Sequence, residues 1–241
     1  YRKESFEAWL LKNMVQQNTS VHWRMVLFLH NLLAAGKGTV KYFYQHYMTL
    51  FNSCFESYKS TIYNITLDPL MLDYLNLRSS NKSNPDENYA RELQELFTVG
   101  KGPNSKFTED DVTAMAKLLV GWTYPNGASF INGPLISLFN DSNHDISDKQ
   151  FSAFYGNRII KGRKGQDGKK ELDEAIDMIF SINECAMYLS RRLYQFFCYP
   201  IIDDTVEKNV IAPMADLLRK NNFELMVPLR ALLGSAHFFD T

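Results

Sequence analysis

The residues best suited to chemistry stand in three separate stretches of this 241-residue chain. A carboxylate beside an imidazole can act as a base and then as an acid. Alternatively, His30, Glu92 and His144 could hold a hard or borderline metal ion, as the cores of helical bundles sometimes do. The candidate polar site comprises His30, Asn31, Glu87, Asn88, Arg91, Glu92, Glu95, His144, Asp145 and Lys149.

Two interpretations of this set remain open. Arg91 has Glu87 four residues before it and Glu95 four residues after it, which is the spacing of ion pairs on one helix. The first interpretation is therefore a network of ion pairs that fixes how helices meet. The second is a catalytic or metal site, although no HExxH, GxSxG, phosphate-loop or Glu-x-x-His pattern favours a particular reaction. The sequence leaves the identity of a metal or other cofactor open.

The segment 86–97 is predicted to be the helix around which the chain is organised. Asn84-Pro85 is a turn signal, Asp86 suits the N-cap, and Gly100 suits a left-handed cap at the other end. At about 100° per residue, apolar and polar residues fall on opposite sides. Tyr89, Leu93 and Phe97 form the buried stripe with Leu96 on the same side, opposite Asn88, Arg91, Glu92 and Glu95. The polar side is expected either to be solvated or to face an internal polar site.

A helix over 21–35 is apolar nearly all round, which predicts that it is buried. Its only polar residues between Arg24 and Gly36 are His30 and Asn31. A buried polar group without a hydrogen-bond partner costs about 1 to 3 kcal/mol. We therefore expect a polar group from elsewhere to meet this pair, or the pair to be satisfied by backbone carbonyls.

Three further segments have clear helix signals. The helix predicted over 39–55 has a broad apolar face, and His46 is expected to point away from it, at the surface or the rim. Asp68-Pro69 combines an N-cap with proline at the first helical position. Residues 108–111 resemble a capping box in which Asp111 replaces the usual glutamate.

The helical period is lost from residue 123 to residue 168. Asn126-Gly127 and Asn132-Gly133 are turn signals, and short strands are expected around 135–139 and 151–160. So long a connection inside a compact domain usually has a role, which makes this insertion a candidate binding flap.

Helical patterns return at 170–182, 184–197, 205–220 and 223–234. The expected fold is mainly α: a multi-helix bundle of about nine to ten helices with a small irregular or β-hairpin insertion at 123–168. Residues 1–241 are expected to form a single domain.

Composition excludes some classes of protein. The 26 Lys and Arg against 27 Asp and Glu provide no basic field for nucleic acid. No apolar run approaches the roughly 18 residues that span a bilayer, and no signal peptide is recognised. The three cysteines lack metal or disulfide spacing. We expect neither a nucleic-acid partner nor a membrane span, and the oligomeric state is open.

Three motifs together resemble one bacterial family. ENYARELQELFTVG at 87–100, FTEDDVTAMAKLLVGW at 107–122 and HDISDK at 144–149 are similar to segments of the family catalogued as domain of unknown function 1800. That family usually has a W-H-N-H-F segment where this chain has Leu-His-Asn-Leu-Leu at 29–33. The departure implies that a site needing both of those imidazoles is impaired or absent.

The resemblance implies a location and a partner without naming a reaction. Family members often carry export signals, so an extracytoplasmic location, periplasmic or secreted, is expected. Their genes often lie beside a second family of unknown function, which suggests a separately encoded exported protein as partner. The favoured function is an exported helical scaffold or partner-binding module, and the alternative is a hydrolytic enzyme with a His/Glu/Arg site between helices.

One geometric criterion separates these two functions. If His30 and the carboxylate of Glu92 or Glu95 converge at the floor of an open pocket, the enzyme is favoured. If packing seals them, the scaffold is favoured.

Overall fold

The computed structural model describes residues 3–17, 20–36, 38–125 and 135–240. Over these residues the chain is mainly helical, with two small antiparallel strand pairs, which confirms the expected fold class. The α-helices are α1 (Lys3–Val15), α2 (His22–Leu32), α3 (Val40–Ser53), α4 (Tyr58–Thr66), α5 (Pro69–Tyr74), α6 (Asn88–Glu92), α7 (Glu109–Leu119), α8 (Lys170–Ser181), α9 (Asn183–Phe197), α10 (Asp204–Val206), α11 (Ala212–Lys220), α12 (Met226–Leu233) and α13 (Ala236–Phe239). The strands are β1 (Trp122–Thr123), β2 (Leu138–Phe139), β3 (Lys149–Gln150) and β4 (Ile159–Ile160).

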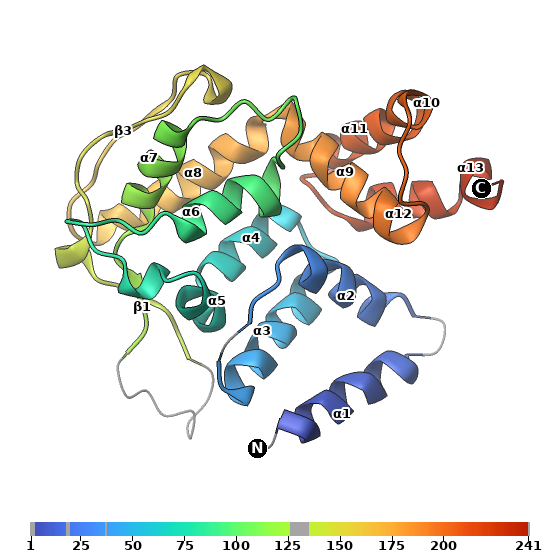
Figure 1. The fold of residues 1–241 in the computed structure, drawn as a ribbon, viewed down its shortest axis with the longest axis horizontal. Coiled ribbons are helices and arrows are strands. Elements are labelled where there is room, and N and C mark those ends of the chain that lie inside the picture. Colours follow the sequence, from blue (N-terminus) through green and yellow to red (C-terminus); the bar gives the residue numbers. More distant parts are fainter. Residues whose placement is uncertain (1–2, 18–19, 37, 126–134, 241) are drawn as a thin grey trace.

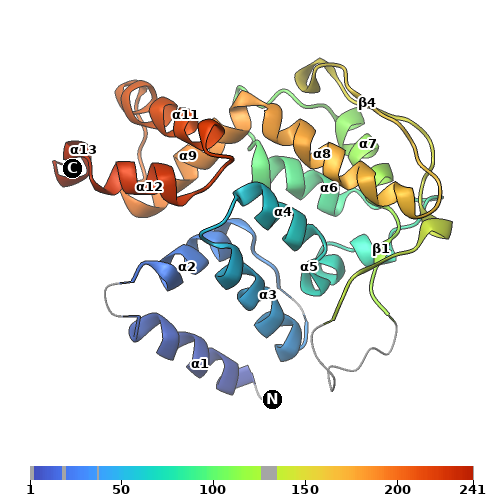
Figure 2. The same cartoon turned by 180° about the vertical axis from the view of Figure 1, so that it is seen from behind.

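The helices are arranged in three groups (Figures 1 and 2). Helices α1 to α3 lie together along the lower side of Figure 1, α4 to α8 lie above them and toward the left, and α9 to α13 extend to the right. The buried hydrophobic side chains of the described chain form one cluster that reaches from Trp23 in α2 to Leu232 in α12. This continuity is what a single domain requires, and the domain limits themselves stay a prediction. No helix in the described ranges is long and apolar enough to cross a membrane.

Local signals in the sequence place several helix ends as predicted. The Asp68 carboxylate accepts hydrogen bonds from the amides of Leu70 and Met71, and Pro69 opens α5. Thr108 and Asp111 form the expected capping box at the start of α7. Gly100 adopts the left-handed conformation with φ of 78°, as a C-terminal cap requires.

The central helix begins at Asn88 with Glu87 at the N-cap, one residue later than predicted, and then changes its winding. After α6 the chain continues as a π-helix, η2 (Leu93–Thr98), which has more residues per turn than an α-helix. Tyr89, Leu93 and Phe97 are buried as expected, whereas Leu96 is 48% exposed and Glu95 is buried. The wider turn rotates the later positions, so the placement of Leu96 on the apolar side is wrong. The burial of Glu95 agrees with one of the two alternatives left open for the polar side.

The insertion contains both strand pairs. β1 pairs with β2 through Trp122 and Phe139, and β3 pairs with β4 through Lys149 and Ile160. These strands are shorter than expected, because 3-10 turns such as η4 (Asp141–Asn143) and η5 (Ala153–Tyr155) occupy much of the segment. The predicted turns at 126–127 and 132–133 lie outside the described residues.

Candidate functional site

The predicted site residues occupy three places in the fold. The first lies where α2, α3 and the start of α5 meet, the second is the outer side of α6 and η2, and the third joins the insertion to α8. No hydrogen bond or ion pair between described side chains links one place to another. Each place is therefore considered separately.

At the first place, His46 of α3 lies next to His30 of α2. His46 is fully buried, because α2, α4 and α5 all pack against α3 and cover its flanks. The expectation of a surface or rim position is wrong for this reason. The two imidazole rings have centroids 5.9 Å apart and lie at 72° to each other, and the Tyr47 ring is 4.6 Å from that of His30.

Asp68 fixes the orientation of the buried imidazole. His46 Nδ1 lies 3.2 Å from Asp68 Oδ1, the same oxygen that caps α5. A carboxylate only accepts, so Nδ1 carries the proton and donates it in this bond. His46 Nε2 is buried and has no hydrogen-bond partner among the described residues, and the same is true of His30 Nδ1. The unpaired nitrogens make this the most unusual polar cluster of the three.

The His30 imidazole is held in its uncharged form. Burial, and then the proximity of His46, lower its pKa to about 4. The neighbouring Asn31 does not join the cluster, because its side-chain oxygen faces outward and accepts from an Arg192 guanidinium nitrogen at 3.2 Å. The expectation of a buried pair is therefore wrong for Asn31, which is exposed, whereas His30 has a neighbour that the sequence did not identify.

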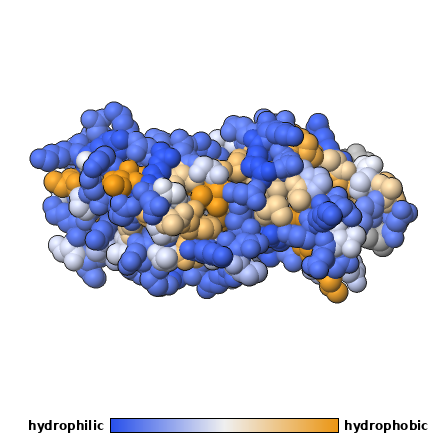
Figure 3. Space-filling model, turned by 90° about the horizontal axis from the view of Figure 1, so that it is seen from above, coloured by the Kyte–Doolittle hydropathy of each residue, from blue (hydrophilic) through white to orange (hydrophobic). Residues whose placement is uncertain are grey.

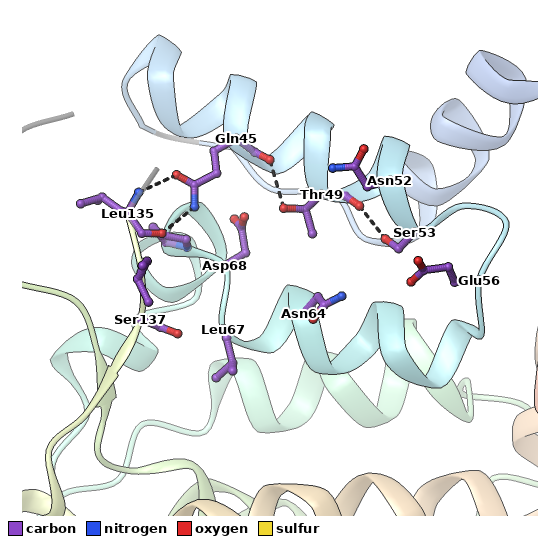
Figure 4. Close-up of a pocket in the computed structure, with 12 residues that line it drawn as sticks. Gln45, Thr49, Asn52, Ser53, Glu56, Asn64, Leu67, Asp68, Leu135 and Ser137 are labelled. Atoms are coloured by element: carbon purple, nitrogen blue, oxygen red, sulfur yellow. Dashed lines mark hydrogen bonds between the residues drawn. The ribbon is translucent and has the colours of Figure 1, made fainter. Parts of the chain in front are cut away.

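A pocket of about 500 Å³ lies beside this cluster, between α3 and α4 (Figure 4). Its wall combines amide and hydroxyl groups, such as those of Gln45, Thr49 and Asn64, with apolar side chains, and Asp68 lies at one end. The Gln45 side chain makes two hydrogen bonds to the backbone of Leu135, of 2.8 and 3.0 Å, which attach the insertion to α3. His46 does not line the pocket, so Asp68 is the contact between the pocket and the histidine cluster.

The second place is a partly solvated ion network. Arg91 binds both carboxylate oxygens of Glu109 at 2.9 and 2.6 Å and one oxygen of Glu87 at 3.2 Å. Glu87 also accepts from the Thr113 hydroxyl at 2.8 Å, and Glu109 is largely exposed. These bonds connect α6 to α7. The arrangement matches the interpretation of a network that fixes two helices.

Two other carboxylates of this helix lie close to it. Glu95 pairs with Lys101, and its oxygen is 3.7 Å from Arg91. Glu92 has one buried oxygen without a partner among the described residues. Burial and then Glu95 raise the pKa of Glu92, and this exceeds the opposite effect of Lys101 and Arg91. Asn88 is exposed and only its backbone amide is bonded, to Asp86.

The third place is a sealed cluster of charged side chains. Glu171 accepts from Lys149 Nζ at 2.8 Å and from His144 Nε2 at 3.1 Å, and all three side chains have at most 1% exposure. His144 Nδ1 donates to the carbonyl of Val120 at 2.8 Å, so both ring nitrogens face acceptors. Lys149 Nζ also donates to the carbonyl of Asp145. Every polar atom here has a structural partner.

Glu171 is the residue of this third place that sequence reasoning missed. It stands in the first turn of α8, where a glutamate usually complements the helix dipole at the surface. Burial raises the pKa of Glu171. This effect is outweighed by the hydrogen bonds from His144 and Lys149, the charge of Lys149 and the Arg163 amide, so the net shift of the pKa is downward. The available signal was Lys149 itself, because a buried ammonium requires a carboxylate.

These placements bear on the metal hypothesis. The described residues contain no group of three or more His, Cys, Asp or Glu side chains arranged to hold a metal ion. His30, Glu92 and His144 in particular are not assembled into one site. Whether any of the predicted residues acts in catalysis stays a prediction.

Comparison with known proteins identifies a family without an activity. No curated protein and no solved structure matches the chain. One family model, described as Protein of unknown function (DUF1800), matches residues 2–241. That match spans the central helix, the insertion and the C-terminal helices alike, so the chain belongs to the DUF1800 family of proteins of unknown function.

Proposed function

We propose that this protein is a partner-binding helical module whose insertion presents an apolar edge to another protein. The observation that carries the proposal is the sealed cluster of His144, Lys149 and Glu171, which joins the insertion to α8. A buried ion pair contributes little net stability, but it selects one arrangement of the groups that it joins. Such a cluster suits a surface that must keep one shape.

A second anchor supports this interpretation. The buried Asp111 carboxylate in α7 accepts from both the backbone amide and the hydroxyl of Ser152, each at 2.7 Å. Two helices of the bundle thus hold the insertion at separate points. An insertion fixed in this way loses little conformational freedom on binding, which favours affinity.

The outer side of the insertion is unusually aliphatic. Four of its side chains are about half or more exposed, namely Ile136 (72%), Leu138 (49%), Ile146 (51%) and Ile159 (49%). Hydrophobic residues appear as separate spots among hydrophilic ones at the end of the molecule where the insertion lies (Figure 3). An exposed apolar side chain on a segment held in one conformation can serve as an anchor for a binding protein. The expected partner is therefore a separate protein with an apolar patch.

The geometric criterion also supports a scaffold. His30 forms no hydrogen bond with Glu92 or Glu95 in the described structure, and the cluster around His144 is closed by packing. The residues predicted for proton transfer are thus either engaged in structural contacts or separated from one another. An extracytoplasmic location and an exported partner, which the family resemblance implies, are part of the proposal, and fractionation of the source bacterium tests the location.

The test compares two surfaces of the same protein. Proteins from an extracytoplasmic extract are captured on the wild type, identified, purified and titrated against variants. The variant Ile146→Asp/Ile159→Asp should weaken binding by about tenfold or more, because it places charges in an apolar interface. Leu11→Asp is the matched control, since Leu11 is a 62% exposed leucine in α1, outside the insertion. Equal affinity of wild type and the double variant would contradict the proposal.

A hydrolytic enzyme is the second candidate, and one observation favours it. His46 and Asp68 form the imidazole–carboxylate pair that general bases use, and Asp68 lines the pocket of Figure 4. No Ser, Thr or Cys side chain of the described residues is bonded to either imidazole of the first place. Screening with ester, peptide and glycoside substrates tests this function, with Asp68→Asn as the variant that should abolish a genuine activity.

A further inference from the structure

The two unpaired imidazole nitrogens of the first place need an explanation. His46 is fully buried, and its Nε2 atom has no partner among the described residues. His30 Nδ1, on the ring 5.9 Å away, is buried and unpaired as well. A buried polar atom without a partner is costly, and native structures rarely contain two such atoms on adjacent rings.

We propose that His30 Nδ1 and His46 Nε2 together bind one monovalent copper ion, Cu(I). The imidazoles of α2 and α3 would be its two protein ligands, and Asp68 would be the carboxylate that orients the second of them. The proposal concerns a different site from the apolar edge of the insertion, so it stands or fails independently of the partner-binding function.

The separation of the rings fits a single bridging atom. With metal–nitrogen bonds of about 2.0 Å, two imidazoles on opposite sides of one ion have centroids roughly 6.3 Å apart. The observed 5.9 Å would correspond to a bent arrangement with a nitrogen–metal–nitrogen angle of roughly 140°. A direct hydrogen bond between ring nitrogens would require centroids about 5.2 Å apart. The pair is therefore too far apart to satisfy itself.

The hydrogen bond to Asp68 prepares His46 as a ligand. Because Nδ1 donates to the carboxylate, Nε2 of the neutral ring carries the free lone pair. Metal-binding histidines almost always donate their other N–H in this way. His30 offers Nδ1, the buried nitrogen of its ring that has no partner among the described residues.

The ligand set favours Cu(I) over divalent ions. Zn²⁺ in proteins takes four ligands, whereas the described residues contain no group of three or more His, Cys, Asp or Glu side chains arranged to hold a metal ion. Cu(I) is a d¹⁰ ion that is stable with two nitrogen ligands, and imidazole suits copper. Its single positive charge would also be balanced by the Asp68 carboxylate in a buried environment. Bound water is the main alternative, although a buried water usually makes about three hydrogen bonds.

The experiment is an anaerobic titration of the 241-residue chain with Cu(I), in competition with a chromogenic Cu(I) chelator. The wild type should bind one equivalent. His30→Gln and His46→Gln should each weaken binding by at least a hundredfold. Asp68→Asn should weaken it by 10- to 100-fold while its amide oxygen still caps α5. X-ray absorption of the loaded wild type should give two nitrogen neighbours.

Two variants control for adventitious binding. His22→Gln removes another imidazole of α2, and Cys198→Ser removes the only thiol of the described chain that is not fully buried. Both should bind Cu(I) like the wild type, and circular dichroism should show that every variant is folded. Binding that survives in both His30→Gln and His46→Gln, binding lost in Cys198→Ser, or no binding at all would overturn the proposal. Equally tight, histidine-dependent binding of Zn²⁺ would overturn the assignment to Cu(I).

Discussion

Lys149 Nζ lies 2.8 Å from Glu171 Oε2, and neither side chain has any exposed surface. Glu171→Gln should therefore lower the free energy of unfolding by about 3 to 5 kcal/mol, because it leaves the Lys149 ammonium buried without its counter-charge. Urea unfolding followed by circular dichroism measures this loss. The control is Glu109→Gln, which removes an exposed carboxylate from Arg91 and should lower the free energy of unfolding by at most about 1 kcal/mol.

A double-mutant cycle separates this ion pair from the other bonds of Glu171. Lys149→Met removes the ammonium and should also destabilise the protein. Because each single variant leaves one group unpaired, Lys149→Met/Glu171→Gln should cost clearly less than the sum of the two single variants. Strict additivity would mean that the two charges do not interact, in which case the cluster could not anchor the insertion as proposed.

Local features of the sequence were sufficient to predict much of the fold. The cap of α5 by Asp68, the capping box of Thr108 and Asp111, and the left-handed Gly100 depend on contacts within a few residues, and all three are confirmed. Such signals depend on hydrogen bonds between near neighbours, which a sequence displays directly.

The sequence could not predict features that depend on distant contacts. His46 is buried because three other helices surround α3, and this crowding leaves no trace in the spacing of its residues. Glu171 lies 27 residues from His144, and nothing local connects them. The π-helical winding of Leu93–Thr98 is set by packing and moves Leu96 outward. The candidate site was therefore predicted as residues, but its division into three places was not.

His30 should make the stability of the protein depend on pH. Its pKa is lowered to about 4 by burial and then by His46, whereas an unfolded chain has a histidine pKa of about 6.5. Between these values the unfolded state binds more protons than the folded state, so stability rises as pH rises from about 4 to about 6.5. The full effect is about 2 to 3 kcal/mol.

The variant His30→Gln isolates this effect, since glutamine does not titrate. Unfolding free energies are measured in urea at several pH values from 4 to 7.5. The wild type should lose more stability than the variant on acidification, and the difference between them should change by about 2 to 3 kcal/mol across the range. Parallel curves for the two proteins would contradict the lowered pKa of His30.

Gly100→Ala should destabilise the end of the central helix. At φ of 78° a side chain is strained, and a Cβ atom there would lie 2.5 Å from Cδ2 of Tyr188. The ring has limited freedom to move, because its hydroxyl donates to the Leu96 carbonyl at 2.6 Å. We expect backbone strain and overpacking together to lower the free energy of unfolding by about 1 to 3 kcal/mol.

Gly102→Ala is the matched control for this prediction. Gly102 lies two residues further along, and nothing stands within 4 Å of the position that its Cβ would occupy. The melting temperature of the Gly102→Ala variant should equal that of the wild type or exceed it slightly, because alanine restricts the unfolded chain. Similar losses in both variants would indicate that the loop after η2 tolerates no side chain, rather than that Gly100 has a special conformation.

Asp111→Asn should loosen the insertion more than the bundle. The carboxylate accepts from Thr108 at the start of α7 and from both the amide and the hydroxyl of Ser152, and an amide group would turn one of these acceptors into a donor. We expect the free energy of unfolding to fall by about 2 to 4 kcal/mol. Hydrogen exchange should show reduced protection at 149–160 while α8 keeps its protection.

Asp110→Asn serves as the control, since Asp110 is the exposed neighbour of Asp111 on the same helix. Its exchange pattern should match that of the wild type. If the insertion acts as the partner-binding surface, Asp111→Asn should also weaken the binding of the captured partner, because the loosened segment must be ordered again on binding. Lost protection at 149–160 with unchanged partner affinity would separate the anchoring of the insertion from its function and place the interface elsewhere on the molecule.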